Sequence, residues 1–326
     1  MSPRKGAIPS HRERPVSSKP VFAPSKIRST TALIVVVFGT VVVSQSEVTA
    51  AIFGNFDASR HSRFLADGSP NPGFLIDESS LSGVGVNSQS VLISPQHILT
   101  AQHFPDSTPT FRGGDGVTRT YSTSGFVDLT THLGVSSFTS DIRLYTLTEA
   151  IPIEHDVRPI ALFNDDPASL LAQEFYLFGQ GNRAGTNVID AVTPATLAGT
   201  ESLTQTIFYT FDTATNGGSN ATADEAGLLP ADSGSAALIQ VGDEIALLGT
   251  HLGISVPSGN NPNDGDLYFN FSTLVTTYIS EIESVVAADG QSISTVSFSS
   301  VVAVPEPSSL AGLFTMLLLM HRRKRS

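Results

Sequence analysis

The stretch that decides the expected fold is Val91-Leu92-Ile93-Ser94-Pro95-Gln96-His97-Ile98-Leu99-Thr100-Ala101-Gln102-His103. Two short apolar runs flank Ser94-Pro95, a pattern typical of two β-strands joined by a turn. His103 follows the second run. Further along, Ser140-Asp141-Ile142-Arg143-Leu144 places an acid at the start of a third apolar run, and Ala231-Asp232-Ser233-Gly234-Ser235 places a serine among small residues.

These residue types suit nucleophilic catalysis. A serine hydroxyl is a weak nucleophile until a base accepts its proton, and a neutral imidazole is the usual base near pH 7. A carboxylate beyond the imidazole fixes its tautomer and stabilises the cation that forms during attack. Taken singly, His103 also fits a surface or capping histidine, and Asp141 fits a residue that begins a strand. The prediction of a catalytic site therefore requires the three side chains to meet in space.

In the chain order His, Asp, Ser, the three stretches resemble the catalytic stretches of trypsin-like (chymotrypsin-fold) serine proteases over residues 82 to 287. The resemblance implies an all-β fold of two six-stranded antiparallel β-barrels with a C-terminal α-helix and the site between the barrels. It also implies that Ser233 attacks, His103 moves the proton and Asp141 orients His103. Asp128 is the rival acid, but its surroundings lack the family's pattern.

The resemblance also assigns the backbone NH groups of Ala231 and Ser233 to an oxyanion hole. The family usually has glycine where Ala231 stands. If a Cβ displaced this NH, the loss of one donor would cost on the order of 10²–10³ in rate. The same resemblance matches Asp232 to the residue that pairs with a new amino terminus.

A partner for Asp232 exists if the chain is cut after Ala51, which exposes Ile52-Phe53-Gly54-Asn55. A cut after Ala50, or a later one near Arg60 or Arg63, is the open alternative.

The substrate-binding positions that the resemblance implies are Gly227, at the base of the primary specificity pocket, and Leu252 and Gly253, on the strand that holds the substrate backbone. A glycine offers no countercharge, so we expect a preference for neutral or apolar side chains. Asp224 and Glu225 are near in sequence and would change this preference if the loop is offset. His251 is expected to be a packed residue rather than a second base.

Composition narrows the setting. The chain has 326 residues and no cysteine, which excludes disulfides, thiolate catalysis and cysteine metal sites; Phe104 stands where a cysteine commonly follows the family's histidine. Residues 51–304 contain 7 Arg, no Lys and 27 Asp plus Glu, a formal net charge of −20 that would repel nucleic acid and anionic membranes. No cofactor or metal is expected, because the polar stretch 260–266 lacks the spacing of a calcium loop and is interpreted as a plain turn.

Short β-rich segments separated by turn residues predict a sandwich or barrel. These segments are 84–93, 97–101, 117–128, 141–147, 158–163, 174–179, 206–212, 235–241, 244–251 and 266–271. After Ser272, a candidate N-cap, apolar residues from Leu274 to Val286 recur at helical spacing and predict one amphipathic helix.

The two ends are typical of processing signals. Residues 1–51 are interpreted as a basic extension and signal peptide with the apolar run Ala32 to Val43, and 52–288 as the protease domain. After a linker at 289–303, residues 304–326 resemble the PEP-CTERM sorting signal of certain Gram-negative bacteria: a Pro305-Glu306-Pro307 motif, an apolar stretch and a basic tail. This resemblance implies an exosortase and a signal peptidase as partners, transient membrane contact, and delivery to the cell surface or extracellular matrix.

Together these observations predict a secreted or surface-sorted serine endopeptidase that acts on protein or peptide substrates. The main alternative is a catalytically inactive surface module with the same fold. An esterase is less favoured, because no Gly-x-Ser-x-Gly elbow is present and the triad order differs.

Overall fold

Strands dominate the structure, a computed structural model that describes residues 34–36, 51–86, 89–198, 200 and 202–300. They are β1 (Ile34–Val36), β2 (Ile52–Phe53), β3 (Ser90–Ser94), β4 (His97–Ala101), β5 (Thr110–Arg112), β6 (Thr118–Thr120), β7 (Thr123–Leu133), β8 (Ser136–Leu147), β9 (Ala161–Phe163), β10 (Glu174–Gly179), β11 (Arg183–Val188), β12 (Ala191–Leu197), β13 (Leu203–Thr210), β14 (Ala226–Gly227), β15 (Ala236–Val241), β16 (Glu244–Ser255), β17 (Phe269–Thr273) and β18 (Thr295–Val296). The helices are α1 (Ala58–His61) and α2 (Ile279–Ala288), with 3-10 turns at Glu78–Ser80, Ile153–His155, Pro167–Leu170, Pro262–Asp264, Val275–Tyr278 and Phe298–Ser300.

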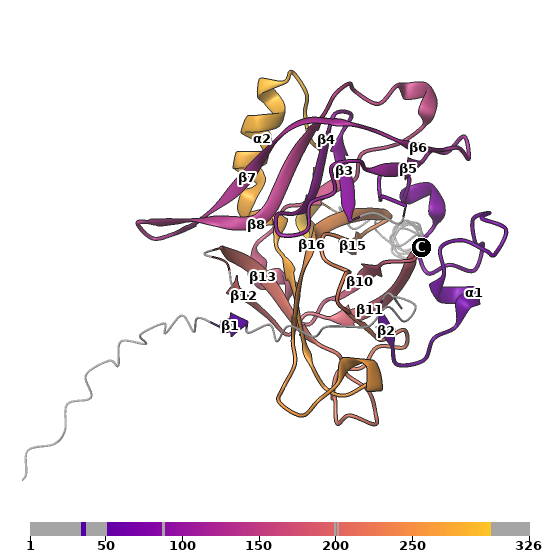
Figure 1. The fold of residues 1–326 in the computed structure, drawn as a ribbon, viewed down its shortest axis with the longest axis vertical. Coiled ribbons are helices and arrows are strands. Elements are labelled where there is room, and N and C mark those ends of the chain that lie inside the picture. The colour runs from indigo at the N-terminus through magenta and orange to yellow at the C-terminus, as the bar shows by residue number, and fades with distance from the viewer. Residues whose placement is uncertain (1–33, 37–50, 87–88, 199, 201, 301–326) are drawn as a thin grey trace, which may run out of the picture. The chain divides into compact units, whose positions relative to one another are not determined.

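The first barrel uses β3 to β8. Four of these strands form an antiparallel sheet in the order β3-β4-β8-β7, and β5 and β6 form a separate hairpin. Strand β4 lies between β3 and β8 and is buried along its whole length, as its apolar sequence predicts. Strands β7 and β8 are longer than predicted because Gly134, at φ +60°, joins them into one projecting hairpin (Figure 1).

The second barrel contains two consecutive strands, β11 and β12, near opposite ends of its strand order. Its sheet runs β12-β13-β17-β16-β15-β10-β11, and β11 leads into β12 after two residues. The sequence pattern missed both strands, because their Gly, Ala, Asn and Pro residues are of types depleted in strands. At Gly185 of β11 a Cβ would collide with Ala226, so only glycine fits this close approach. The predicted all-β fold with two β-barrels and one C-terminal helix is confirmed.

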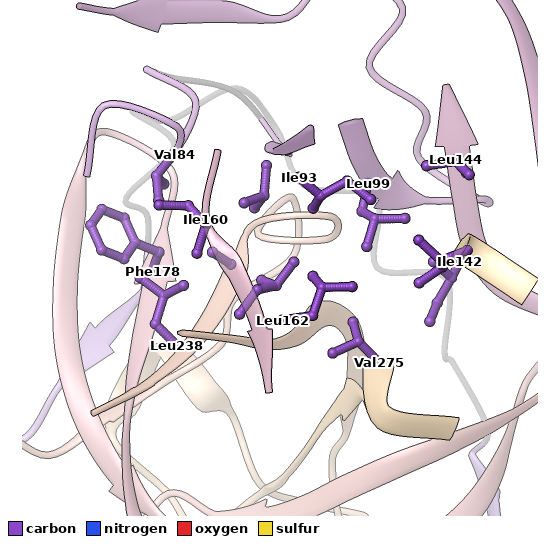
Figure 2. Packing of buried hydrophobic residues seen from close by; sticks show 14 of the residues in the cluster. Val84, Ile93, Leu99, Ile142, Leu144, Ile160, Leu162, Phe178, Leu238 and Val275 are labelled. Carbon is purple, nitrogen blue, oxygen red and sulfur yellow. The ribbon is translucent and has the colours of Figure 1, made fainter. Parts of the chain in front are cut away.

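A hydrophobic core joins the two barrels. Figure 2 shows side chains of the first barrel, such as Leu99 and Ile142, packed toward Leu162, Leu238 and Val275. All five are buried. Burying apolar surface of this kind stabilises by roughly 25 cal/mol per Å². The packing fixes the strand ends that carry the proposed site.

The C-terminal helix begins later than predicted. The 3-10 turn Val275–Tyr278 precedes α2, and Tyr278 at the N-cap makes no capping side-chain bond. Ser272 is therefore not the N-cap that the sequence predicted. It lies in β17, and its hydroxyl contacts His251 Nδ1 at 2.8 Å and the Tyr209 hydroxyl at 3.0 Å.

The predicted linker at 289–303 is in part packed against the second barrel. Strand β18 pairs with β9 in parallel, and the Phe298 ring lies edge-on to Phe163 with centroids 5.1 Å apart. The aromatic contact explains why a Ser/Val-rich segment is held there.

Most of the predicted terminal signals lies outside the described residues, at 1–33, 37–50 and 301–326. Within the predicted signal peptide, Ile34–Val36 forms β1, which pairs in parallel with β12. In the described part of the chain, no helix is long and apolar enough to cross a membrane.

Candidate active site

The first barrel brings His103 and Asp141 together through strand pairing. Ala101, at the end of β4, pairs with Ile142 of β8, so the chain beyond β4 runs alongside Asp141. The Gln102 NH donates to the Asp141 carbonyl at 3.1 Å, and the His103 NH donates to Asp141 Oδ1 at 2.9 Å. The backbone thus fixes the imidazole over the carboxylate.

The side chains of the three predicted residues meet in one chain of contacts. His103 Nδ1 lies 2.7 Å from Asp141 Oδ2, and His103 Nε2 lies 2.9 Å from Ser233 Oγ. The Asp141 side chain is fully buried, whereas that of His103 is 21% exposed. A hydroxyl, an imidazole and a buried carboxylate are therefore within hydrogen-bond reach of one another, an arrangement that can activate a nucleophile.

Asp141 and the rival acid, Asp128, differ in their hydrogen-bond partners. Burial raises the pKa of the Asp141 carboxyl above its usual value, and the hydrogen bonds from His103 oppose that rise. Asp128 is engaged by Arg143, whose Nε lies 2.6 Å from Oδ1 and whose Nη2 lies 2.9 Å from Oδ2. Asp141, not Asp128, is the acid that faces the imidazole.

The loop around Ser233 has two residues in the left-handed region. Ala231 has φ +86° and Gly234 has φ +82°. The Gly234 NH donates to the His251 carbonyl at 2.9 Å, which ties the loop to β16. Among the described residues, the NH groups of Ala231 and Ser233 have no hydrogen-bond acceptor. The alanine keeps a glycine-like conformation, and both predicted oxyanion donors are available.

Sequence reasoning missed two supporting residues. Gln89 Nε2 donates to the Ala231 carbonyl at 2.8 Å, which holds the loop that bears Ser233. Thr204 Oγ1 accepts the Asp141 NH at 2.7 Å. Neither residue lies in a recognisable motif, and each contact joins segments distant in sequence.

The Asp232 side chain is buried next to Ala51. Its carboxylate accepts the NH groups of Leu229 at 2.7 Å, Gln180 at 2.8 Å and Ala51 at 3.1 Å. Burial raises its pKa to about 6, and these three bonds oppose the rise. Ile52, the predicted partner, instead pairs with Gly227.

Gly227 is buried against an aromatic ring. A Cβ there would collide with the Tyr268 hydroxyl, which donates to the Leu228 carbonyl at 2.8 Å.

The two acids near Gly227 in sequence are already bound. Arg60 Nη2 and His61 Nε2 lie 2.6 and 3.0 Å from Asp224 oxygens. Glu225 Oε1 accepts from Asn187 Nδ2 at 2.8 Å, and burial raises its pKa to about 7. Neither acid is a free countercharge.

The predicted substrate strand is the C-terminal half of β16. Leu252 is buried with Leu197 and Phe271, and the ladder with β17 is irregular between His251 and Gly253. His251 is fully buried, and burial lowers its pKa to about 3. This histidine is a packed, neutral side chain. In the described segments no group of three or more His, Asp or Glu could hold a metal ion.

Comparisons with known proteins bear on the family of this chain. A solved structure, a kallikrein-related peptidase 10, is 19% identical, with 60% of this chain and 87% of that chain covered and a TM-score of 0.37. A search of curated proteins finds no match. The sequence model of the family described as Trypsin matches residues 78–280, more than half of the chain. That match shows that this chain belongs to the trypsin family.

Proposed function

We propose that this protein is a serine endopeptidase that hydrolyses peptide bonds through an acyl-enzyme. The observation that carries the proposal is the continuous contact from Asp141 through His103 to Ser233, at 2.7 and 2.9 Å. The family match supports the same chemistry.

The geometry supports the following sequence of steps. Ser233 Oγ attacks the peptide carbonyl carbon while its proton passes to His103 Nε2, and the NH groups of Ala231 and Ser233 bind the oxyanion. As the C–N bond breaks, His103 gives the proton to the departing amine. Water then attacks the Ser233 ester while its proton passes to His103. As the bond between the acyl carbon and Ser233 Oγ breaks, His103 returns this proton to Oγ and the acid is released. Asp141 accepts a hydrogen bond from the Nδ1–H group of His103, which fixes the tautomer, and it stabilises the imidazolium.

The proposed preference is for neutral or apolar substrate side chains. Gly227 lies against Tyr268, and Leu228 and Leu229 are buried beside it. Asp224 and Glu225 already accept hydrogen bonds from neighbouring side chains. We therefore do not propose that either carboxylate selects Lys or Arg in the substrate. Leu252 and Gly253 are proposed to bind the substrate backbone.

Maturation is proposed to place an ammonium group on Asp232. The Ala51 nitrogen already lies 3.1 Å from this buried carboxylate, so a cut after Ala50 fits better than one after Ala51. A new ammonium there would stabilise the ionised carboxylate that burial penalises. We expect the mature chain to begin at Ala51 and Asp232→Ala to lose most of its hydrolytic activity. A different mature N-terminus with full activity would reject the pairing.

Export and surface sorting remain part of the proposal. Their support is the sequence pattern of residues 1–51 and 304–326, with a signal peptidase and an exosortase as proposed partners. The location follows from those patterns: the surface or extracellular matrix of a Gram-negative bacterium.

The test is digestion of denatured casein by the full chain beside Ser233→Ala, with the fragments read by mass spectrometry. We expect internal cleavage only by the wild type, after neutral or apolar residues. Equal cleavage by the variant would reject the mechanism. No cleavage by the folded wild type would favour the inactive surface module, and turnover of esters alone would favour an esterase.

A further inference from the structure

A cavity of about 310 Å³ lies on the first barrel, away from the proposed catalytic residues. Its lining includes Arg112 and Arg158, and the remaining wall comes from Pro70, Glu78, Ser79, Ser82, Gly113, Gly114, Gly116 and Asp156. The volume is within the range of small-ligand sites, which begins at about 300 Å³. None of the triad residues lines it.

Arg112 is the unusual residue in this cavity. It is only partly exposed, and among the described residues its guanidinium has no hydrogen bond or ion pair. Its guanidinium carbon lies 5.7 Å from the centroid of the Phe64 ring. A chain segment with 7 Arg and 27 acidic residues offers many possible partners, so an arginine without one is unexpected.

The acidic residues of the lining do not neutralise Arg112. Arg63 donates hydrogen bonds to both carboxylate oxygens of Glu78, from Nε at 2.7 Å and from Nη2 at 2.8 Å. Asp156 Oδ1 accepts from Arg158 Nε at 3.0 Å. In the part of the chain that is described, the Nη groups of Arg158 have no acceptor, so they and the whole Arg112 guanidinium are available to a ligand.

The wall beside Arg112 is held in place by tight backbone packing. A Cβ at Gly113 would collide with the His155 carbonyl, and one at Gly114 with the Asp156 carboxylate. The Gly114 NH also donates to the Asp156 carbonyl at 3.0 Å. The hairpin that carries Arg112 is therefore pressed against the turn that leads to Arg158.

We infer that this cavity binds a carboxylate-bearing peptide segment through Arg112 and Arg158. A guanidinium presents paired donors that match a carboxylate, and such charge-assisted bonds are about twice as strong as neutral ones. A lone inorganic anion would leave most of the 310 Å³ empty, whereas a short acidic peptide would fill it. The negative charge of the rest of the protein is screened beyond roughly 8 Å at physiological salt. This inference goes beyond the proposed hydrolysis.

The experiment is isothermal titration of acetyl-(Glu)₄-amide into full-length Ser233→Ala, so that cleavage does not interfere. We expect binding that weakens at least roughly tenfold in Arg112→Gln and in Arg158→Gln. The matched control is Arg119→Gln, on the neighbouring strand β6. Its guanidinium already binds Asp115 at 2.6 Å, so it should bind the peptide as the parent does.

Several results would overturn the inference. They are no binding by the parent, equal affinity for acetyl-(Gln)₄-amide, or unchanged affinity in both arginine variants when thermal unfolding shows them folded. Displacement of the peptide by equimolar sulfate would also overturn it in favour of a simple anion site. Because hydrolysis is not measured, these outcomes are separate from a failure of the proposed protease activity.

Discussion

Replacing Ala231 by glycine tests how the proposed oxyanion loop is built. Ala231 has φ +86°, a conformation that costs an L-residue roughly 1–2 kcal/mol and costs glycine almost nothing. Glycine also loses more backbone freedom on folding, an opposing effect of roughly 0.4–1 kcal/mol. We therefore expect Ala231→Gly to be more stable than the wild type by about 1 kcal/mol.

The rate should respond differently from the stability. Since Ala231 already has the glycine-like conformation and its NH has no acceptor among the described residues, the donor is in place without the substitution. We expect kcat of Ala231→Gly to stay within roughly threefold of the wild type. A displaced donor would instead predict a gain on the order of 10²–10³.

Urea unfolding and casein hydrolysis measure the two effects separately. Ala172→Gly is the matched control, because Ala172 also has a positive φ, +61°, and is exposed in a loop outside the proposed site. It should gain stability without a change in rate. A variant Ala231→Gly that is less stable than the wild type, or that hydrolyses casein a hundredfold faster, would show that the Ala231 NH is not held as described.

Three further changes have defined outcomes. Asp141→Asn should lower kcat by roughly 10⁴, because the amide cannot hold the His103 tautomer, and a loss under tenfold in casein assays would contradict this. The pKa of Glu225 in the folded protein is about 7, above its usual 4.5, so the folded state favours the protonated side chain. Its stabilising contribution is therefore lost as the pH rises through 7. Urea titrations should show that the wild type loses about 2 kcal/mol more between pH 5 and pH 8 than Glu225→Gln does; equal losses would remove Glu225 as the cause. Gly227→Ala should lower the free energy of unfolding by roughly 1–3 kcal/mol in the same titration, because the new Cβ would collide with Tyr268. An unchanged unfolding midpoint would show that Tyr268 moves away without cost.

Local sequence frames singled out three residues whose side chains lie in contact in the structure. His103, Asp141 and Ser233 each follow or precede a strand or turn whose pattern is visible in a few residues. Once the strands pair, β4 and β8 bring the first two together without further information.

The surroundings of the triad could not be predicted in the same way. Gln89 and Thr204 act through contacts that span 142 and 63 residues, and no short pattern records such pairings. The position of Ala51 at Asp232 also depends on how the N-terminal segment pairs with β14. Strands β11 and β12 were missed because pairing with β10 and β13, rather than local propensity, holds their small and polar residues.

The most direct test of the account is mass spectrometry of the full chain after exposure to a fluorophosphonate, beside the Ser233→Ala variant. An activated serine oxygen forms a bond to phosphorus as fluoride leaves, so the reagent reports the assembled nucleophile. We expect one adduct, on Ser233, that is absent from the variant. Folded wild-type protein that takes up no reagent, or that is labelled at another residue, would contradict this expectation.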